Sequence, residues 1–306
     1  MYRNHVLLYS RLQKITFQNI QWNAEAATYS DNAIRLESFS NMTLQLINCT
    51  MQNSQADAPF YLKVDSPSAN STVFLQNSHF TNNAFSVIGI SSINTGANTN
   101  QLLRIEGCTF LNNMILAKLL CDGENSSQSL QIHDSQFESN HDGLFSINNT
   151  ATNVSLEVFM NSSVFKSNAL NTSMGGILQV DASEHSSQNL SVVQSSFNST
   201  VAGTGGIFHV LAKPNAMMNI TIEASQFTNN EAVNAGSILW LSSTESTVNL
   251  NVTNSSFQDS KAQSNGAFYV LTRSMVTTMQ NVTINNSDGG FLSVTPSGTD
   301  ANVSIR

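Results

Sequence analysis

A phrase that recurs about every thirty residues limits the folds open to this chain more than any other feature does. The phrase has the form SxFxxN, and a small residue with a short apolar run follows it, as in SQFTNN (225–230) and GSILWL (236–241). The spacings between its central residues, here termed anchors, are 34, 29, 30, 27, 28, 32, 30, 30 and 27 residues. Ten copies without a break in composition predict a single repetitive domain over residues 1–306. The anchors are Phe17, Met51, Phe80, Phe110, Phe137, Phe165, Phe197, Phe227, Phe257 and Ile284.

Within each copy, apolar and polar residues alternate before the anchor. Leu103 and Ile105, for example, precede Phe110 by seven and five residues. This alternation is typical of a half-buried strand, and no segment sustains the spacing of an amphipathic helix. Asn, Ser and Gly fill the gaps between the apolar runs, and Asn and Gly tolerate the left-handed backbone of sharp corners. Each copy therefore predicts two or three short strands separated by turns.

Three short strands bury an apolar face only by stacking on their neighbours. The sequence therefore predicts an all-β fold, a single-stranded parallel β-helix with about ten turns of about 30 residues. Equivalent residues of stacked coils lie about 4.8 Å apart, so the anchors should form one internal ladder. The alternatives are a leucine-rich repeat, whose LxxLxLxxN consensus is missing, and a β-propeller, whose blades need about 40–50 residues. A second, amide ladder is expected at an inner corner from Asn83, Asn113, Asn140, Asn168 and Asn230.

Two elements of the repeat resemble a known family. SQFTNN, CTFLNN, SQFESN and SVFKSN resemble the FxxN element of the polymorphic outer membrane protein repeat, and GGIL and GGIF resemble its GG[AI][IL] element. The resemblance covers about residues 10–306. It implies a right-handed parallel β-helix of the pectin-lyase-like class. It also implies a place among secreted adhesins and large surface proteins.

Composition argues against a nucleic-acid partner. Only 10% of the residues are charged, the net charge is −8, and the Lys and Arg residues are scattered rather than clustered. The polar surface must come instead from 39 Asn and 44 Ser. Sixteen N-x-S/T sequons, including those at Asn189, Asn219 and Asn251, leave N-glycosylation in a secretory route open.

One patch of titratable residues is a candidate for chemistry. Glu106 and His133 share a predicted column on adjacent turns, and Asp134 follows, so these three are the candidates for polysaccharide lyase or hydrolase catalysis. Glu138 and Asp142 are weak candidates for a divalent-cation site, although no known calcium-loop pattern supports them. The alternative is a solvated acidic edge in which His133 only pairs with Glu106. No cofactor is expected.

Cysteines and aromatic residues complete the candidate list. Cys49 and Cys108 share an inward column two turns apart, too far for a disulfide, so both are predicted to be free and buried. Tyr61, His209 and Tyr269 share a column predicted to be exposed, where their rings could stack on sugars.

These observations favour a non-enzymatic adhesion or recognition stalk that is extracellular or on a cell surface. Its expected partner is a surface glycan or a cell-surface protein. A pectin-lyase-like polysaccharide lyase or hydrolase and a purely structural spacer are the alternatives. The final segment NVSIR repeats a strand pattern without a polar cap, so we expect the chain to be part of a longer, membrane-anchored protein whose anchor lies outside these residues.

Overall fold

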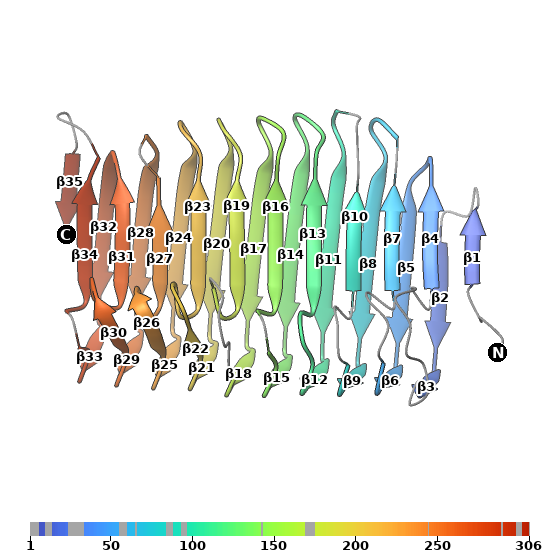
Figure 1. The fold of residues 1–306 in the computed structure, drawn as a ribbon, viewed down its shortest axis with the longest axis horizontal. Helices are drawn as coiled ribbons and strands as arrows, with labels where there is room; N and C mark the ends of the chain where they lie inside the picture. Colours follow the sequence, from blue (N-terminus) through green and yellow to red (C-terminus); the bar gives the residue numbers. More distant parts are fainter. Residues whose placement is uncertain are drawn as a thin grey trace.

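The computed structural model is all-β and describes residues 6–9, 14–23, 34–54, 60–64, 66–83, 88–92, 97–141, 143–168, 175–243, 245–288, 290–297 and 302–305. Each strand pairs in parallel with its equivalents in the preceding and following coils, which stacks the coils into a parallel β-solenoid (Figure 1). No helix occurs in the described ranges. The predicted fold class, a parallel β-helix built from stacked repeats, is confirmed.

Three long parallel sheets form the walls, and a fourth, short sheet lies along part of one edge. Sheet A contains β1 (Val6–Tyr9), β4 (Ile34–Ser38), β7 (Phe60–Val64), β10 (Ile88–Ser92), β13 (Ala117–Cys121), β16 (Phe145–Asn149), β19 (Leu178–Ala182), β23 (Phe208–Ala212), β27 (Leu239–Ser242), β31 (Phe268–Thr272) and β34 (Leu292–Pro296). Sheet B contains β2 (Lys14–Gln18), β5 (Met42–Ile47), β8 (Asn70–Gln76), β11 (Asn100–Glu106), β14 (Ser127–His133), β17 (Ser155–Asn161), β20 (Ser187–Val193), β24 (Met217–Glu223), β28 (Thr247–Thr253), β32 (Ser274–Gln280) and β35 (Asn302–Ile305). Sheet C contains β3 (Gln21–Asn23), β6 (Thr50–Gln52), β9 (His79–Thr81), β12 (Thr109–Leu111), β15 (Gln136–Glu138), β18 (Val164–Lys166), β21 (Ser196–Asn198), β25 (Gln226–Thr228), β29 (Ser256–Gln258) and β33 (Thr283–Asn285). Sheet D contains β22 (Val201–Ala202), β26 (Glu231–Ala235) and β30 (Lys261–Ser264), which the sequence pattern did not predict.

Left-handed residues make the corners on both sides of sheet C. Asn48, Asn77 and Asn254 have φ values of 52°, 48° and 51° in the turn between sheets B and C. Asn82 and Asn229 have φ values of 55° and 54° just after sheet C. Because Asn reaches this region at lower cost than most residues, its abundance follows from the need for two sharp corners in every coil.

Stacked phenylalanine rings run through the core. From Phe80 to Phe257, each ring lies nearly parallel to the ring in the next coil, with centroids 4.6–4.9 Å apart and interplanar angles of 1–11°. Their exposure is at most 1%. Burial of each side chain stabilises the fold by about 1.5–3 kcal/mol. The ladder members with these stacking contacts are Phe80, Phe110, Phe137, Phe165, Phe197, Phe227 and Phe257.

The first predicted anchor is wrong. Phe17 pairs with Leu46 in sheet B, whereas Trp22 pairs with Met51 in sheet C and so occupies the ladder column. Trp22 lies 29 residues before Met51, a normal period, whereas the predicted spacing from Phe17 was 34. The pattern misled because this coil has two aromatic residues, and Ile20 replaces the small residue that normally stands two positions before the anchor.

The last predicted anchor has the predicted register but a different environment. Ile284 pairs with Phe257, yet it is 45% exposed. Its strand, β33, is the last of sheet C among the described strands, so no further strand of that sheet covers it. Ile284 therefore adds little to the buried ladder.

Asparagine side chains form a continuous buried ladder at the corner after sheet C. The Nδ2 atoms of Asn83, Asn113 and Asn140 donate to Oδ1 of the asparagine in the next coil at 2.7, 3.1 and 3.0 Å, and the last acceptor is Asn168. Each Oδ1 also accepts the backbone N–H of the preceding coil, as between Asn113 N and Asn140 Oδ1 at 2.9 Å. Thr200 takes the next place in the column and separates Asn168 from Asn230.

Candidate functional site

The three residues predicted for catalysis lie at or beside the corner between sheets B and C. Glu106 and His133 pair in register on adjacent coils. Glu106 Oε2, however, accepts a hydrogen bond from Arg104 Nη2 at 3.1 Å, and the His133 ring packs against Phe159 with centroids 5.3 Å apart. Asp134 is the left-handed corner residue, with φ of 47°. Each of the three thus has a structural role: Glu106 pairs within its strand, His133 packs against the next coil, and Asp134 forms a corner.

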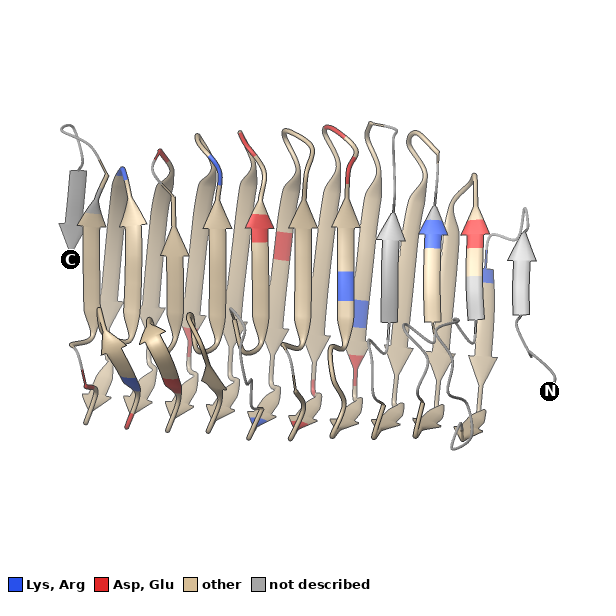
Figure 2. Cartoon of the chain, in the orientation of Figure 1, with Lys and Arg blue, Asp and Glu red and all other residues tan. Residues whose placement is uncertain are grey.

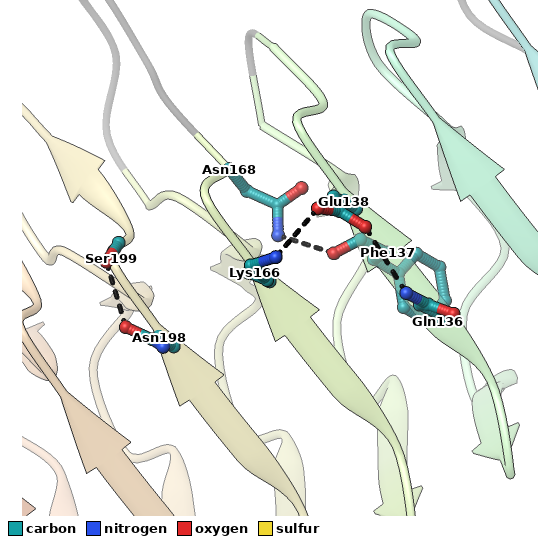
Figure 3. A network of polar contacts seen from close by, with 7 residues as sticks. All are labelled: Gln136, Phe137, Glu138, Lys166, Asn168, Asn198 and Ser199. Carbon is teal, nitrogen blue, oxygen red and sulfur yellow. Dashed lines mark hydrogen bonds and ion pairs between the residues drawn. The ribbon is translucent and has the colours of Figure 1, made fainter.

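Of the two metal candidates, Glu138 lies within the described residues. Glu138 lies on β15 of sheet C, where Lys166 Nζ from the next coil approaches its Oε1 at 3.0 Å (Figure 3). Gln136 Nε2 donates to the other carboxylate oxygen at 3.3 Å. Asp142 lies outside the described residues. Within the described ranges, no group of three or more His, Cys, Asp or Glu residues is arranged to hold a metal ion.

The outer face of sheet B is a regular surface over its later described coils. In β20, β24, β28 and β32, every second residue points outward, and these sixteen residues (four on each of four strands) define what we call the polar face. Glu223 is the only charged residue among them. Figure 2 likewise shows few charged residues on the described strands and turns. The other members are Ser187, Asn189, Ser191, Val193, Met217, Asn219, Thr221, Thr247, Asn249, Asn251, Thr253, Ser274, Val276, Thr278 and Gln280.

Hydrogen bonds between coils order the polar face. Asn219 Nδ2 donates to Asn189 Oδ1 at 2.8 Å, and Asn249 Nδ2 donates to Asn219 Oδ1 at 2.9 Å. Thr221 and Asn251 stand beside this ladder on adjacent coils. Amides and hydroxyls therefore repeat at the coil spacing of about 4.8 Å, and the face offers hydrogen-bond donors and acceptors with little charge.

The predicted exposed aromatic column has a different structure. Tyr61, His209 and Tyr269 do occupy one outward column of sheet A, but His209 is buried, with 1% exposure. Trp240, which sequence reasoning missed, stands between His209 and Tyr269 in the same column. Its ring stacks on His209 at 4.4 Å and on Tyr269 at 6.2 Å. Because the rings cover one another, the faces of Trp240 are not free to stack on a sugar.

Glycine-rich backbone explains why His209 is buried. A Cβ on Gly175 or Gly205 would lie 2.9 or 3.0 Å from the Cβ of His209, so these glycines let the loops before β19 and β23 pack against the histidine. Burial lowers the pKa of His209 to about 4, since the charged imidazolium would lose its hydration. The sequence GTGGIFHV (203–210) contains a sign of this burial. Two consecutive glycines stand shortly before His209, whose column otherwise faces solvent.

The three cysteines are free and buried, as predicted for Cys49 and Cys108. Cys49 and Cys108 lie in a column where serine is the usual residue, and Ser78 stands between them. Burial raises the pKa of the Cys108 thiol to about 11. These thiols pack inside the solenoid and do not contribute to an exposed site.

No protein-family model, no curated protein and no solved structure matches this chain. The fold and geometry therefore define a class, the parallel β-solenoids, without assigning a family. No helix in the described part of the chain is long and apolar enough to cross a membrane.

Proposed function

We propose that this β-solenoid is a non-enzymatic adhesion or recognition module of a secreted or cell-surface protein, and that it binds through the polar face of sheet B. The observation that carries the proposal is the ordered array of amides and hydroxyls on four adjacent coils, in which Glu223 is the only charge. Such a face suits an uncharged, hydroxyl-rich partner such as a surface glycan, because it offers many hydrogen bonds and little electrostatic steering.

Polysaccharide cleavage is less well supported. Glycoside hydrolysis uses two carboxyl groups about 5–9.5 Å apart across the scissile bond. In the described strands of sheets A and B, no two acids occupy the same outward column on adjacent coils. Glu106, the best candidate acid, is already paired with Arg104. The alternative of a plain spacer gives no reason for a face with so few charges.

The proposal can be tested by adding charge to the polar face. Protein made without glycosylation would be screened for saturable binding to a glycan array and to cells. A variant that combines Thr221→Lys with Asn251→Lys places two like charges on adjacent coils of the face. We expect it to lose at least about tenfold in affinity, because two desolvated, unpaired charges oppose contact. The matched control, Gln226→Lys with Ser256→Lys, makes the same change on adjacent coils of sheet C and should bind normally.

Three outcomes would overturn the proposal. One is the absence of saturable binding to any glycan or cell. Another is equal binding by the two charge variants, which would exclude sheet B as the contact surface. The last is glycosylation of the native protein at the sequons of Asn189, Asn219 and Asn251, which all lie on the polar face. Glycans attached there in the native protein would cover the face.

A further inference from the structure

The inner corner between sheets A and B changes from polar to apolar along the solenoid. The second residue of each long sheet B strand points into this corner and is buried, with at most 3% exposure. The later coils place apolar side chains there, whereas the earlier coils place mostly amides and a hydroxyl. In chain order the column contains Ser71, Gln101, Gln128, Leu156, Gln188, Met218, Val248 and Met275.

The amide N–H groups in this corner have protein partners. Gln101 Nε2 donates to the carbonyl oxygen of Leu120 at 2.7 Å, which shows that this position reaches the end of the sheet A strand in the same coil. Gln128 Nε2 donates to Gln101 Oε1 at 2.8 Å, and Gln188 Nε2 donates to the carbonyl oxygen of Val154 at 3.5 Å. The glutamines are therefore anchored through their nitrogen atoms.

Two of the glutamine oxygen atoms and one whole asparagine amide have no hydrogen-bond partner among the described residues. Gln128 Oε1, Gln188 Oε1 and both polar side-chain atoms of Asn149 are buried and accept or donate no hydrogen bond within the described part of the chain. Asn149 ends β16 and is 1% exposed. The next sheet B strand after Asn149 places Leu156 in the glutamine column, between Gln128 and Gln188. Asn149 thus ends the sheet A strand that lies along the chain between Gln128 and Leu156, and the leucine that follows in the column cannot bond to an amide.

We propose that this corner is a binding site for ordered internal water, which bridges the Asn149 amide to Gln128 Oε1 and Gln188 Oε1. Burying such polar atoms without partners is costly, and internal waters typically satisfy groups of this kind through two to four hydrogen bonds each. The four atoms comprise three oxygen acceptors and one NH2 donor, which water can satisfy because it both donates and accepts. Asn148 pairs in register with Asp181 of the next coil. The residue after Asp181 in that coil, Ala182, is small.

Two measurements test the site. Oxygen-17 relaxation dispersion of the intact protein counts long-lived internal waters, and Asn149→Leu should remove at least one. The same variant should lower the melting temperature by about 2–5 °C, because leucine displaces the water and leaves both glutamine oxygens unpaired. Asn148→Leu is the matched control, since Asn148 is the exposed neighbour on the same strand, and it should keep the water count.

A rise in melting temperature for Asn149→Leu, with an unchanged water count, would overturn the proposal, since it would mean that the corner is dry. Retention of the water signal in that variant would place the water elsewhere. A signal that depends on added sodium or potassium would identify a cation as the occupant and overturn the choice of water. The double variant Asn149→Leu with Gln188→Met removes one of the two unpaired glutamine oxygens, copies the apolar side chain of Met218 in the next coil, and should recover part of the stability lost by Asn149→Leu alone.

Discussion

The imidazole of His209 lies parallel to the indole of Trp240, with ring centroids 4.4 Å apart and 6° between the ring planes. His209 Nδ1 is buried and has no hydrogen-bond partner among the described residues. Burial without a partner for Nδ1 favours the neutral form of the His209 imidazole in the folded protein. The contact therefore links the stability of sheet A to pH.

Acid should weaken the fold through His209. Its pKa is about 4 when folded and 6.5 when unfolded, so only the unfolded chain takes up the proton as the pH falls from 6.5 toward 4. Stability should thus be unaffected by this group above pH 6.5 and should fall by up to about 3 kcal/mol near pH 4. Urea unfolding at a series of pH values would measure the loss. His209→Phe should flatten the profile, while His141→Ala, an exposed control, should not.

The phenylalanine ladder should be sensitive to truncation in its middle. Phe165 is fully buried and stacks on Phe137 and Phe197 at 4.6 and 4.7 Å. Phe165→Ala should cost about 3–5 kcal/mol, because it removes a large side chain and leaves a cavity. Ile284→Ala, in the same column but 45% exposed, should cost under about 1 kcal/mol. Similar losses in chemical denaturation would contradict the difference in burial.

The buried asparagine ladder should contribute more than its exposed neighbour. Asn113 accepts from the backbone N–H and Nδ2 of Asn83 and donates to Asn140 and to the Phe80 carbonyl. Asn113→Ala leaves several buried groups unpaired and should cost about 2–4 kcal/mol. Among the described residues, the side chain of Asn112 forms one exposed hydrogen bond, to Asn82 at 3.0 Å, and Asn112 has φ of 57°. Asn112→Gly keeps the left-handed turn and should cost under about 1 kcal/mol. Equal thermal shifts would argue against the ladder as a stabilising unit.

The native thiols should resist modification. All three cysteines are buried, which keeps a reagent from reaching them. Burial also raises the pKa of Cys121 and raises that of Cys108 to about 11, so the Cys108 thiolate is scarce at pH 8. A colorimetric disulfide reagent should detect no fast-reacting thiol in the native protein and three thiols after denaturation. Rapid reaction of even one thiol in native protein would place that cysteine at the surface.

The sequence predicts those parts of the structure that repeat from coil to coil. The ladder from Phe80 to Phe257 and the corner asparagines follow from the thirty-residue period, because each coil must match its neighbours. The register at Trp22 was missed where the repeat is least regular. The burial of His209 was missed because it depends on loops that Gly175 and Gly205 allow to fold over the column, a tertiary effect that alternation does not record. The candidate catalytic residues share a corner, but the partner of Glu106 is on its own strand.

The one-to-one register between coils also bears on how the length of such a molecule can change. Phe197 and Phe227 occupy the same position in successive coils. Removing residues 198–227 would therefore join equivalent points of the backbone and keep every column in register. Inserting a copy of the same segment would lengthen the solenoid by about 4.8 Å and keep the same register. Length is thus adjustable in whole coils, whereas a change of a few residues inside a strand would disturb every column at once.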